Sequence, residues 1–175
     1  MNAMKVVRGG VVSAAGFRVS AAAGAIKYEN RDDVALLVAD EPCDAAAVFT
    51  TNKVAAAPVL YDREIVKGGK VQAILANSGC ANACTGKDGL ADARLSALVT
   101  AGELGIDSSH VLVASTGVIG RRLPLERLLN GMRKAKVSLG RTSKHGLSAA
   151  KAVMTTDTKP KEACVTTYIG SKKIT

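Results

Sequence analysis

Residues 111–120 read VLVASTGVIG, the most informative stretch of the chain. Its start, Val111–Ala114, is apolar and rich in β-branched side chains, which predicts a short buried strand. Ser115, Thr116 and Gly117 then end the apolar run. Such a break leaves a hydroxyl and backbone N–H groups without partners in a β-ladder, and donors of this kind can stabilise a developing negative charge, as in an oxyanion hole. By spacing alone, an ordinary turn between a strand and a helix is the better explanation.

Hydrophobic patterns on both sides of this stretch predict the remaining strands and helices. Four short apolar runs before residue 77 predict strands and hence a largely antiparallel sheet in this half; they cover residues 33–39, 45–50, 57–61 and 71–76. Helical spacing follows, and a last apolar run predicts a final strand; these segments cover residues 90–104, 124–137, 143–154 and 163–170.

Length and composition limit the class of fold. A chain of 175 residues suits one domain or one large half of a bigger one. Hydrophobic residues make up 47% of it, aromatic residues only 3%, and Trp is absent, so the core must consist of Ala, Val, Leu and Ile side chains. Alanine-rich helices together with valine-rich strands favour a layered α/β or α+β domain.

The chain carries a net charge of +9, from 24 Lys and Arg against 15 Asp and Glu. Such an excess is compatible with nucleic acid, with an anionic small substrate or with an acidic partner subunit. The basic residues are scattered and few aromatic side chains lie among them to stack on bases, so we expect no nucleic-acid partner. We also expect no membrane anchor and a cytoplasmic location, because the sequence has neither a secretory leader nor a long apolar run.

The cysteines suggest neither a disulfide framework nor a metal site. There are four of them, namely Cys43, Cys80, Cys84 and Cys164. Cys80 and Cys84 have C-x3-C spacing with no histidine nearby, so we expect two free thiols and no bound metal. Cys80 as a nucleophile requires a base, and neither His110 nor His145 has a carboxylate partner close in sequence.

A second group of hydroxyl side chains follows the last predicted helix. Residues 154–158 read MTTDT, and the hydroxyl groups of Thr155 and Thr156 can bind a carboxylate or an amine of a small substrate. Helix capping and a turn before Pro160 explain them better by spacing alone. From the residues themselves, donors are plentiful, but a convincing nucleophile and base are missing.

Several stretches together resemble one family, the ornithine acetyltransferases, also called glutamate N-acetyltransferases. The resemblance is collinear from about Gly9 to the last residue. It is carried by GFRVSAAAGAIK (16–27), AAAVFTTNKVAAAPV (45–59), ANSGCANACTG (76–86), STGVIGRRLP (115–124) and MTTDTKPKEA (154–163). One departure is AGAIK at residues 23–27, where the family pattern has AGIK, and we expect it to shift a turn without touching the chemistry.

The resemblance implies roles for the residues singled out above. The oxyanion-hole pair of the family falls on Thr116 and Gly117, and its substrate-binding threonine falls on Thr155, with Thr156 as the next choice. The family nucleophile is a threonine that becomes N-terminal when a precursor cleaves itself at an Ala-Thr bond, so no residue of this chain takes that role. The α-amino group of such a threonine has an ordinary pKa near ~8 and can act as the base.

The family implies an α+β fold, an α/β sandwich in which helices flank two β layers. This fold is similar to that of the N-terminal-nucleophile hydrolases, but its strands and helices are connected in a different order. A second (β) chain completes the fold. Residues 1–175 are then a single domain, the α-chain part of a self-cleaved precursor without its cleavage-site segment. We expect an α2β2 heterotetramer.

The implied activity is acetyl transfer in arginine biosynthesis. N-acetylornithine acylates the β-chain threonine and glutamate then takes the acetyl group, by a ping-pong mechanism. No cofactor is expected, and acetyl-CoA is a possible second donor. Two alternatives stay open, namely a related self-cleaving aminopeptidase and an inert binding fragment.

Overall fold

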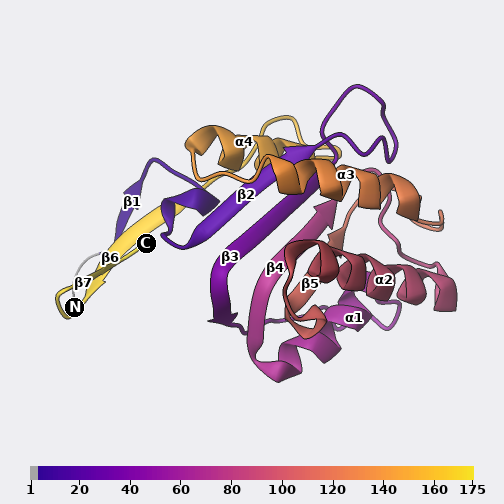
Figure 1. The fold of residues 1–175 in the computed structure, drawn as a ribbon, viewed down its shortest axis with the longest axis horizontal. Helices are drawn as coiled ribbons and strands as arrows, with labels where there is room; N and C mark the ends of the chain where they lie inside the picture. Colours follow the sequence, from indigo (N-terminus) through magenta and orange to yellow (C-terminus); the bar gives the residue numbers. More distant parts are fainter. Residues whose placement is uncertain (1–3) are drawn as a thin grey trace.

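The structure, a computed structural model, describes residues 4–175 and has an α+β architecture (Figure 1). Strands and helices alternate along most of the chain, with three short 3-10 helices (η) between them. In order, the elements are β1 (Lys5–Val7), η1 (Val11–Ser13), β2 (Phe17–Ala22), β3 (Val34–Asp44), α1 (Ala57–Ile65), η2 (Val66–Gly68), β4 (Lys70–Asn77), α2 (Gly86–Leu104), η3 (Ser108–His110), β5 (Val111–Ser115), α3 (Leu125–Val137), α4 (Ser143–Ala152), β6 (Cys164–Ile169) and β7 (Lys172–Ile174).

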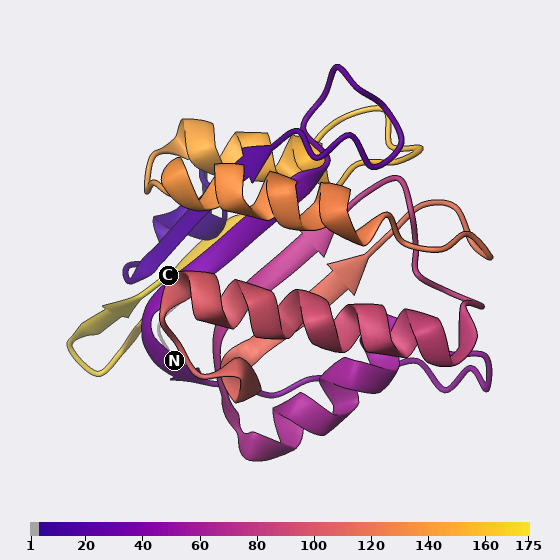
Figure 2. The same cartoon turned by 45° about the vertical axis from the view of Figure 1, so that its right-hand side comes forward.

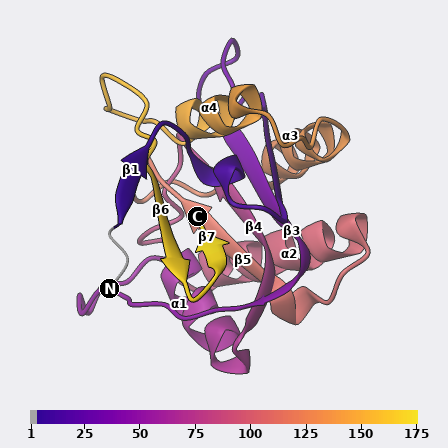
Figure 3. The ribbon, with the colours of Figure 1, turned by 90° about the vertical axis from the view of Figure 1, so that its left-hand side faces the viewer.

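The main sheet has four strands in the order β2-β3-β4-β5. The pairs β2–β3 and β3–β4 are antiparallel, as the sequence predicts for the first half of the chain, whereas β4 and β5 are parallel. The connection between these two parallel strands contains α2. A separate three-stranded antiparallel sheet, β1-β6-β7, pairs the beginning and the end of the described chain (Figure 3).

Alternation along the strands divides the main sheet into two faces. In β4, Val71, Ala73 and Leu75 are buried, and the residues between them are only half-buried. The buried face packs against α2 and α3, which lie across it (Figure 2). Three alanines of α2, at positions 93, 97 and 101, are at most 2% exposed. A core built from such small side chains explains how a chain almost without aromatic residues buries its sheet.

The opposite face of the main sheet is covered only in part. Val19 and Ala35 pack there against Ala149 and Ala152 of α4. Leu37 and Ile74 extend this apolar face but are only half-buried.

The helices and the mixed sheet confirm the predicted α+β class. Within residues 4–175, no helix combines the length and apolar content that crossing a bilayer requires.

Two predicted strands before β4 are wrong. Residues 45–50 are irregular, and Val48 is fully exposed. Residues 57–61 instead begin the helix α1, whose buried side chains, Ala57, Pro58 and Tyr61, follow a helical rather than an alternating period. Pro58 is favourable in the first turn of a helix, because no intrahelical acceptor is available there for a backbone N–H. The apolar run at residues 57–61 is too short to distinguish the period of a helix from that of a strand.

Helix α1 occupies the free edge of β5. The Tyr61 hydroxyl donates a hydrogen bond to the Val111 carbonyl oxygen at 3.2 Å, and an Asp62 carboxylate oxygen accepts one from the Val113 N–H at 3.0 Å. These backbone groups would otherwise pair with a further strand. At the other edge, β2 exchanges two backbone hydrogen bonds with Gly140 through Val19, at 2.9 and 3.2 Å. Burial raises the pKa of Asp62 to about 6, and the hydrogen bond from Val113 opposes that shift.

Replacing Asp62 with Asn should stabilise the protein at neutral pH and have little effect in mild acid. The raised pKa of about 6 means that the folded state disfavours the charged carboxylate. This cost is largest above the folded pKa and disappears as the pH falls through about 6 towards the unfolded value near ~3.9. Urea unfolding should therefore give Asp62→Asn an advantage of about 2 kcal/mol at pH 7.5 that shrinks by pH 4.5.

Asp62→Ala is the matched control for this experiment. It removes the acceptor of the Val113 N–H as well as the charge, so it should not share the gain at neutral pH. If the free energy of unfolding differs between the wild type and Asp62→Asn by the same amount at every pH, burial does not disfavour the charged form of Asp62.

Candidate active site at the ends of β4 and β5

The parallel pairing of β4 and β5 brings two polar loops to one end of the sheet. The register ends at Asn77 opposite Ser115, so residues 78–85 and 116–124 leave the sheet side by side. The Thr116 N–H donates to the Asn77 carbonyl oxygen at 3.0 Å, and the Ala81 N–H donates to the Val118 carbonyl oxygen at 2.9 Å. Ligand sites commonly form at the carboxyl ends of parallel strands.

Gly117 lies directly against the backbone of the neighbouring loop. A Cβ atom added to it would lie 2.5 Å from the Gly79 carbonyl carbon and 2.7 Å from the Cys80 nitrogen, far inside van der Waals contact. Its φ of +129° is also a conformation that side chains rarely adopt. Glycine is therefore required here for close approach as well as for backbone freedom.

Further contacts anchor the loop of residues 116–124, which follows β5. Arg122 makes a bidentate ion pair with Asp92 of α2, with N–O distances of 2.8 and 3.1 Å, and Asp92 is only 5% exposed. The Gly120 N–H donates to the Ala83 carbonyl oxygen at 2.8 Å. Because its backbone is anchored on both sides, this loop can present donors in fixed positions.

A third segment closes the site from the end of α4. The Ser78 hydroxyl, buried, donates to the Ala152 carbonyl oxygen at 2.6 Å, and the Arg31 guanidinium donates to the Met154 carbonyl oxygen at 2.6 Å. These two bonds place the chain around residues 154–156 beside the loop of Thr116. The result is a cavity of about 450 Å³ lined by Lys27, Tyr28, Arg31, Ser78, Gly79, Thr116, Gly117, Val118, Met154, Thr155 and Thr156.

All four site residues predicted from the sequence thus border one cavity, although some 40 positions separate the two pairs. Thr116 is exposed, and its backbone N–H is already used by Asn77. Among the described residues, no group accepts a hydrogen bond from the Gly117 N–H. The Thr116 side-chain hydroxyl and the Gly117 N–H are therefore available to a ligand. Thr155 and Thr156 are also exposed, and the Thr155 N–H donates to Asp157 at 3.3 Å.

Other candidates weighed from the sequence have structural roles. Cys80 is buried and its thiol donates to the Arg121 carbonyl oxygen at 3.3 Å. The Asn77 and Asn82 amides donate to the Cys80 and Gly89 carbonyl oxygens, both at 2.9 Å. Neither histidine lines the cavity. Within residues 4–175, no cluster of His, Cys, Asp and Glu side chains has the grouping that holds a metal ion.

The sequence did not single out the cationic wall of the cavity. Lys27 and Arg31 lie near the Tyr28 ring, with their charged groups 4.9 and 5.9 Å from its centroid. Hydrogen bonding and charge from Lys27, with a smaller contribution from Arg31, lower the pKa of Tyr28. The only signal was the AGAIK stretch, whose departure from the family pattern we expect to shift a turn without touching the chemistry; Lys27 ends that stretch and borders the cavity.

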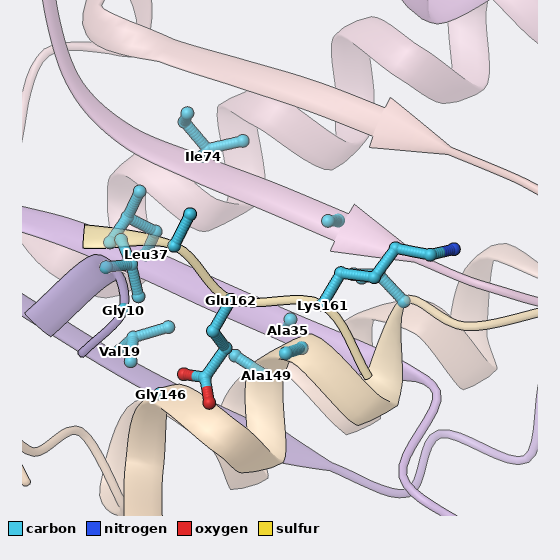
Figure 4. Close-up of a pocket in the computed structure, with 14 residues that line it drawn as sticks. Gly10, Val19, Ala35, Leu37, Ile74, Gly146, Ala149, Lys161 and Glu162 are labelled. Carbon is cyan, nitrogen blue, oxygen red and sulfur yellow. The ribbon is translucent and has the colours of Figure 1, made fainter. Parts of the chain in front are cut away.

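A second cavity, of about 420 Å³, lies on the face of the main sheet that α4 covers in part (Figure 4). Its floor is apolar and includes Leu37 and Ile74, and its α4 side includes Ala149. Lys161 and Glu162 lie on the segment that crosses its opening, and the Glu162 side chain extends towards Gly146. It lacks the convergent donors of the first cavity, so we do not assign chemistry to it.

Comparisons with known proteins agree on one family. The model of the ArgJ family matches residues 18–175. The arginine biosynthesis bifunctional protein ArgJ of Symbiobacterium thermophilum is 46% identical over 174 residues, which are 98% of this chain and 43% of that protein. The ArgJ protein of Geobacter sulfurreducens is 49% identical over 146 residues, which are 83% of this chain and 37% of that protein. This chain therefore spans less than half the length of these relatives.

Solved structures give the same result for the fold. The crystal structure of the Bacillus halodurans ArgJ protein superposes with a TM-score of 0.94 at 38% identity, covering 99% of this chain and 91% of that one. Ornithine acetyltransferase of Mycobacterium tuberculosis, complexed with ornithine, gives a TM-score of 0.87 at 38% identity, covering 94% of this chain and 88% of that one.

Gly117→Ala should destabilise the protein far more than Gly120→Ala, its matched control. Both glycines have positive φ, +129° and +78°, but an added Cβ at Gly120 meets no atom within 4 Å. Left-handed strain alone costs alanine about 1–2 kcal/mol, and overpacking adds about 1–3 kcal/mol. Urea unfolding should therefore show a loss of about 3 kcal/mol for Gly117→Ala. Equal losses in the two variants would show that the loops do not depend on close approach.

Proposed function

Because the chain belongs to the ArgJ family, we propose that it is part of a glutamate N-acetyltransferase, which moves an acetyl group from N-acetylornithine to glutamate. The supporting observation is the single cavity that Thr116, Gly117, Thr155 and Thr156 share. A relative of similar fold was solved in complex with ornithine, the leaving product of that reaction.

The proposed chemistry needs a nucleophile that this chain does not supply. We assign it to the N-terminal threonine of a second (β) chain, released from the same precursor by self-cleavage. Its hydroxyl oxygen attacks the acetyl carbonyl carbon while its α-amino group takes the hydroxyl proton. The C–N bond then breaks, ornithine leaves with that proton, and an acetyl-threonine ester remains. In the second half of the ping-pong cycle, the glutamate amine attacks this ester and the threonine hydroxyl is restored.

Thr116 and Gly117 are proposed as the oxyanion hole for both tetrahedral intermediates. The side-chain hydroxyl of Thr116 and the N–H of Gly117 donate hydrogen bonds to the carbonyl oxygen as it becomes negative. Both donors come from a loop that backbone hydrogen bonds anchor to residues 77–81 and that the Arg122 side chain anchors to Asp92, so little reorganisation is needed when the charge develops. Each donor of this kind contributes about 3–4 kcal/mol to transition-state stabilisation.

Thr155 is proposed as the substrate-binding threonine, with Thr156 as the second choice. Their position next to the oxyanion loop depends on Ser78 and Arg31, which bind the carbonyl oxygens of Ala152 and Met154. The same proposal treats residues 1–175 as one α-chain domain in an α2β2 heterotetramer of the cytoplasm. It includes a sandwich of two β layers like that of N-terminal-nucleophile hydrolases. It requires no cofactor, and acetyl-CoA remains a second possible donor.

The deciding experiment is an acetyl-transfer assay on this chain co-expressed with the polypeptide that follows it in its gene. Transfer from N-acetylornithine to glutamate should be far faster than transfer to water, and the second polypeptide should begin with threonine. Release of amino acids from peptides without acetyl transfer would assign the site to an aminopeptidase. A folded complex with neither activity would refute the proposal.

Thr116→Val should lower kcat strongly, whereas Thr116→Ser should retain most of it. Valine keeps the shape of the side chain but lacks the hydroxyl, and loss of one oxyanion donor lowers kcat about 100- to 1000-fold. Because Thr116 is exposed, both variants should unfold at nearly the wild-type urea concentration. Comparable kcat values for the two variants would rule out the hydroxyl as an oxyanion donor.

A further inference from the structure

We infer that the ammonium group of Lys27 binds the α-carboxylate that N-acetylornithine and glutamate have in common. This inference rests on the proposed function and adds to it a residue that selects the substrate class. Lys27 borders the cavity of Thr116, Gly117 and Thr155 and is contributed by the segment between β2 and β3.

The charges around the cavity favour an anionic ligand. Lys27 and Arg31 are the ionisable cations among the lining residues, and no Asp or Glu side chain lines this cavity. The two cations come from the segment between β2 and β3, with their charged groups 4.9 and 5.9 Å from the Tyr28 ring centroid, while the proposed oxyanion donors come from the loop after β5. A ligand that spans the two walls therefore places a negative group near the cations and a polarised carbonyl oxygen near Thr116 and Gly117.

Of the two cations, Lys27 is the one available to a ligand. The Arg31 guanidinium already donates to the Met154 carbonyl oxygen at 2.6 Å and to the Asp32 carbonyl oxygen at 3.4 Å. Lys27 is exposed, and in the part of the chain that the structure describes it forms no ion pair with a carboxylate. Its ammonium lies 4.9 Å from the Tyr28 ring centroid. An ammonium has three N–H donors, so hydrogen bonding to the Tyr28 side chain still leaves donors for a ligand.

The backbone that carries Lys27 is held rigidly. The carboxylate of Asp33, only 2% exposed, accepts hydrogen bonds from the Gly24 N–H at 2.7 Å and from the Ile26 N–H at 2.6 Å. Ile26 is itself 1% exposed. Gly79 packs so closely on this segment that an added Cβ would lie 2.8 Å from Lys27 Cβ. The root of the Lys27 side chain is thus fixed relative to the loop that contacts Gly117.

This placement accounts for the use of one site by two substrates. In N-acetylornithine the acetylated nitrogen and the carboxylate are bonded to the same carbon, and in glutamate the attacking amine and the α-carboxylate are related in the same way. Binding that carboxylate at Lys27 sets the reacting nitrogen in one position for both half-reactions. The ornithine side chain ends in a cation, so it must extend away from the Lys27 and Arg31 wall.

The test compares Lys27→Gln with the wild type in the whole protein, including the second chain. N-acetylornithine is compared with its carboxamide, which keeps the shape of the substrate but lacks the charge. Lys144→Gln is the matched control, because Lys144 is exposed at the beginning of α4, the end away from Thr155. Loss of a charge-assisted contact should lower kcat/KM for N-acetylornithine and for glutamate about tenfold or more, mainly through KM, and leave the carboxamide unchanged.

Two outcomes overturn the inference. One is an unchanged kcat/KM for the acids in Lys27→Gln. The other is an equal loss for the acid and its carboxamide, which would mean that Lys27 acts on the fold or on the chemistry and not on the carboxylate.

Calorimetric titration separates this inference from the proposed function, because it needs no turnover. A wild-type protein that binds N-acetylornithine at least tenfold more tightly than Lys27→Gln does, without transferring acetyl, refutes the acetyltransferase and supports the carboxylate contact. Transfer by the wild type together with equal binding by both proteins supports the enzyme and overturns the contact.

Discussion

The contact of Gly117 with the backbone of Gly79 and Cys80 is the constraint on which the rest of the site depends. It is possible only because β4 and β5 are parallel and end together, so that their loops leave the sheet in the same direction. Each loop then supplies backbone partners for the other. Any side chain at position 117 would separate the loops and displace the backbone that carries the Thr116 hydroxyl.

A line of buried polar contacts joins this centre to the segments around it. The side chain of Asp33 holds the segment of Lys27, and its carbonyl oxygen accepts a hydrogen bond from the Ser78 N–H at 2.9 Å. The Ser78 hydroxyl in turn binds the end of α4. Three stretches that are distant in sequence therefore meet through two small residues. A buried carboxylate with two N–H donors and a buried hydroxyl with a carbonyl partner avoid the cost of unsatisfied polar groups.

Much of this fold can be predicted from the sequence, because long apolar periods leave little ambiguity. The strands around Leu36, Leu75 and Val113 and the helices α2, α3 and α4 follow from such periods. Helix α1 cannot be predicted in this way, because its apolar run is short and its side chains are buried only where the helix packs against the edge of β5. The break at Thr116 is local and visible in the sequence. The Lys27 wall is not visible, because only tertiary register brings a segment before β3 to loops that follow β4 and β5.

Both edges of the main sheet are already occupied, one by Tyr61 and Asp62 and the other by the backbone of Gly140. Within residues 4–175, a further strand could pair with these backbone groups only by displacing Tyr61, Asp62 or Gly140. The partly covered face that contains Leu37 and Ile74 is open to side-chain contact instead. Association through that face depends on shape and apolar area and not on backbone pairing, and the occupied edge groups oppose accidental strand-by-strand polymerisation of the main sheet.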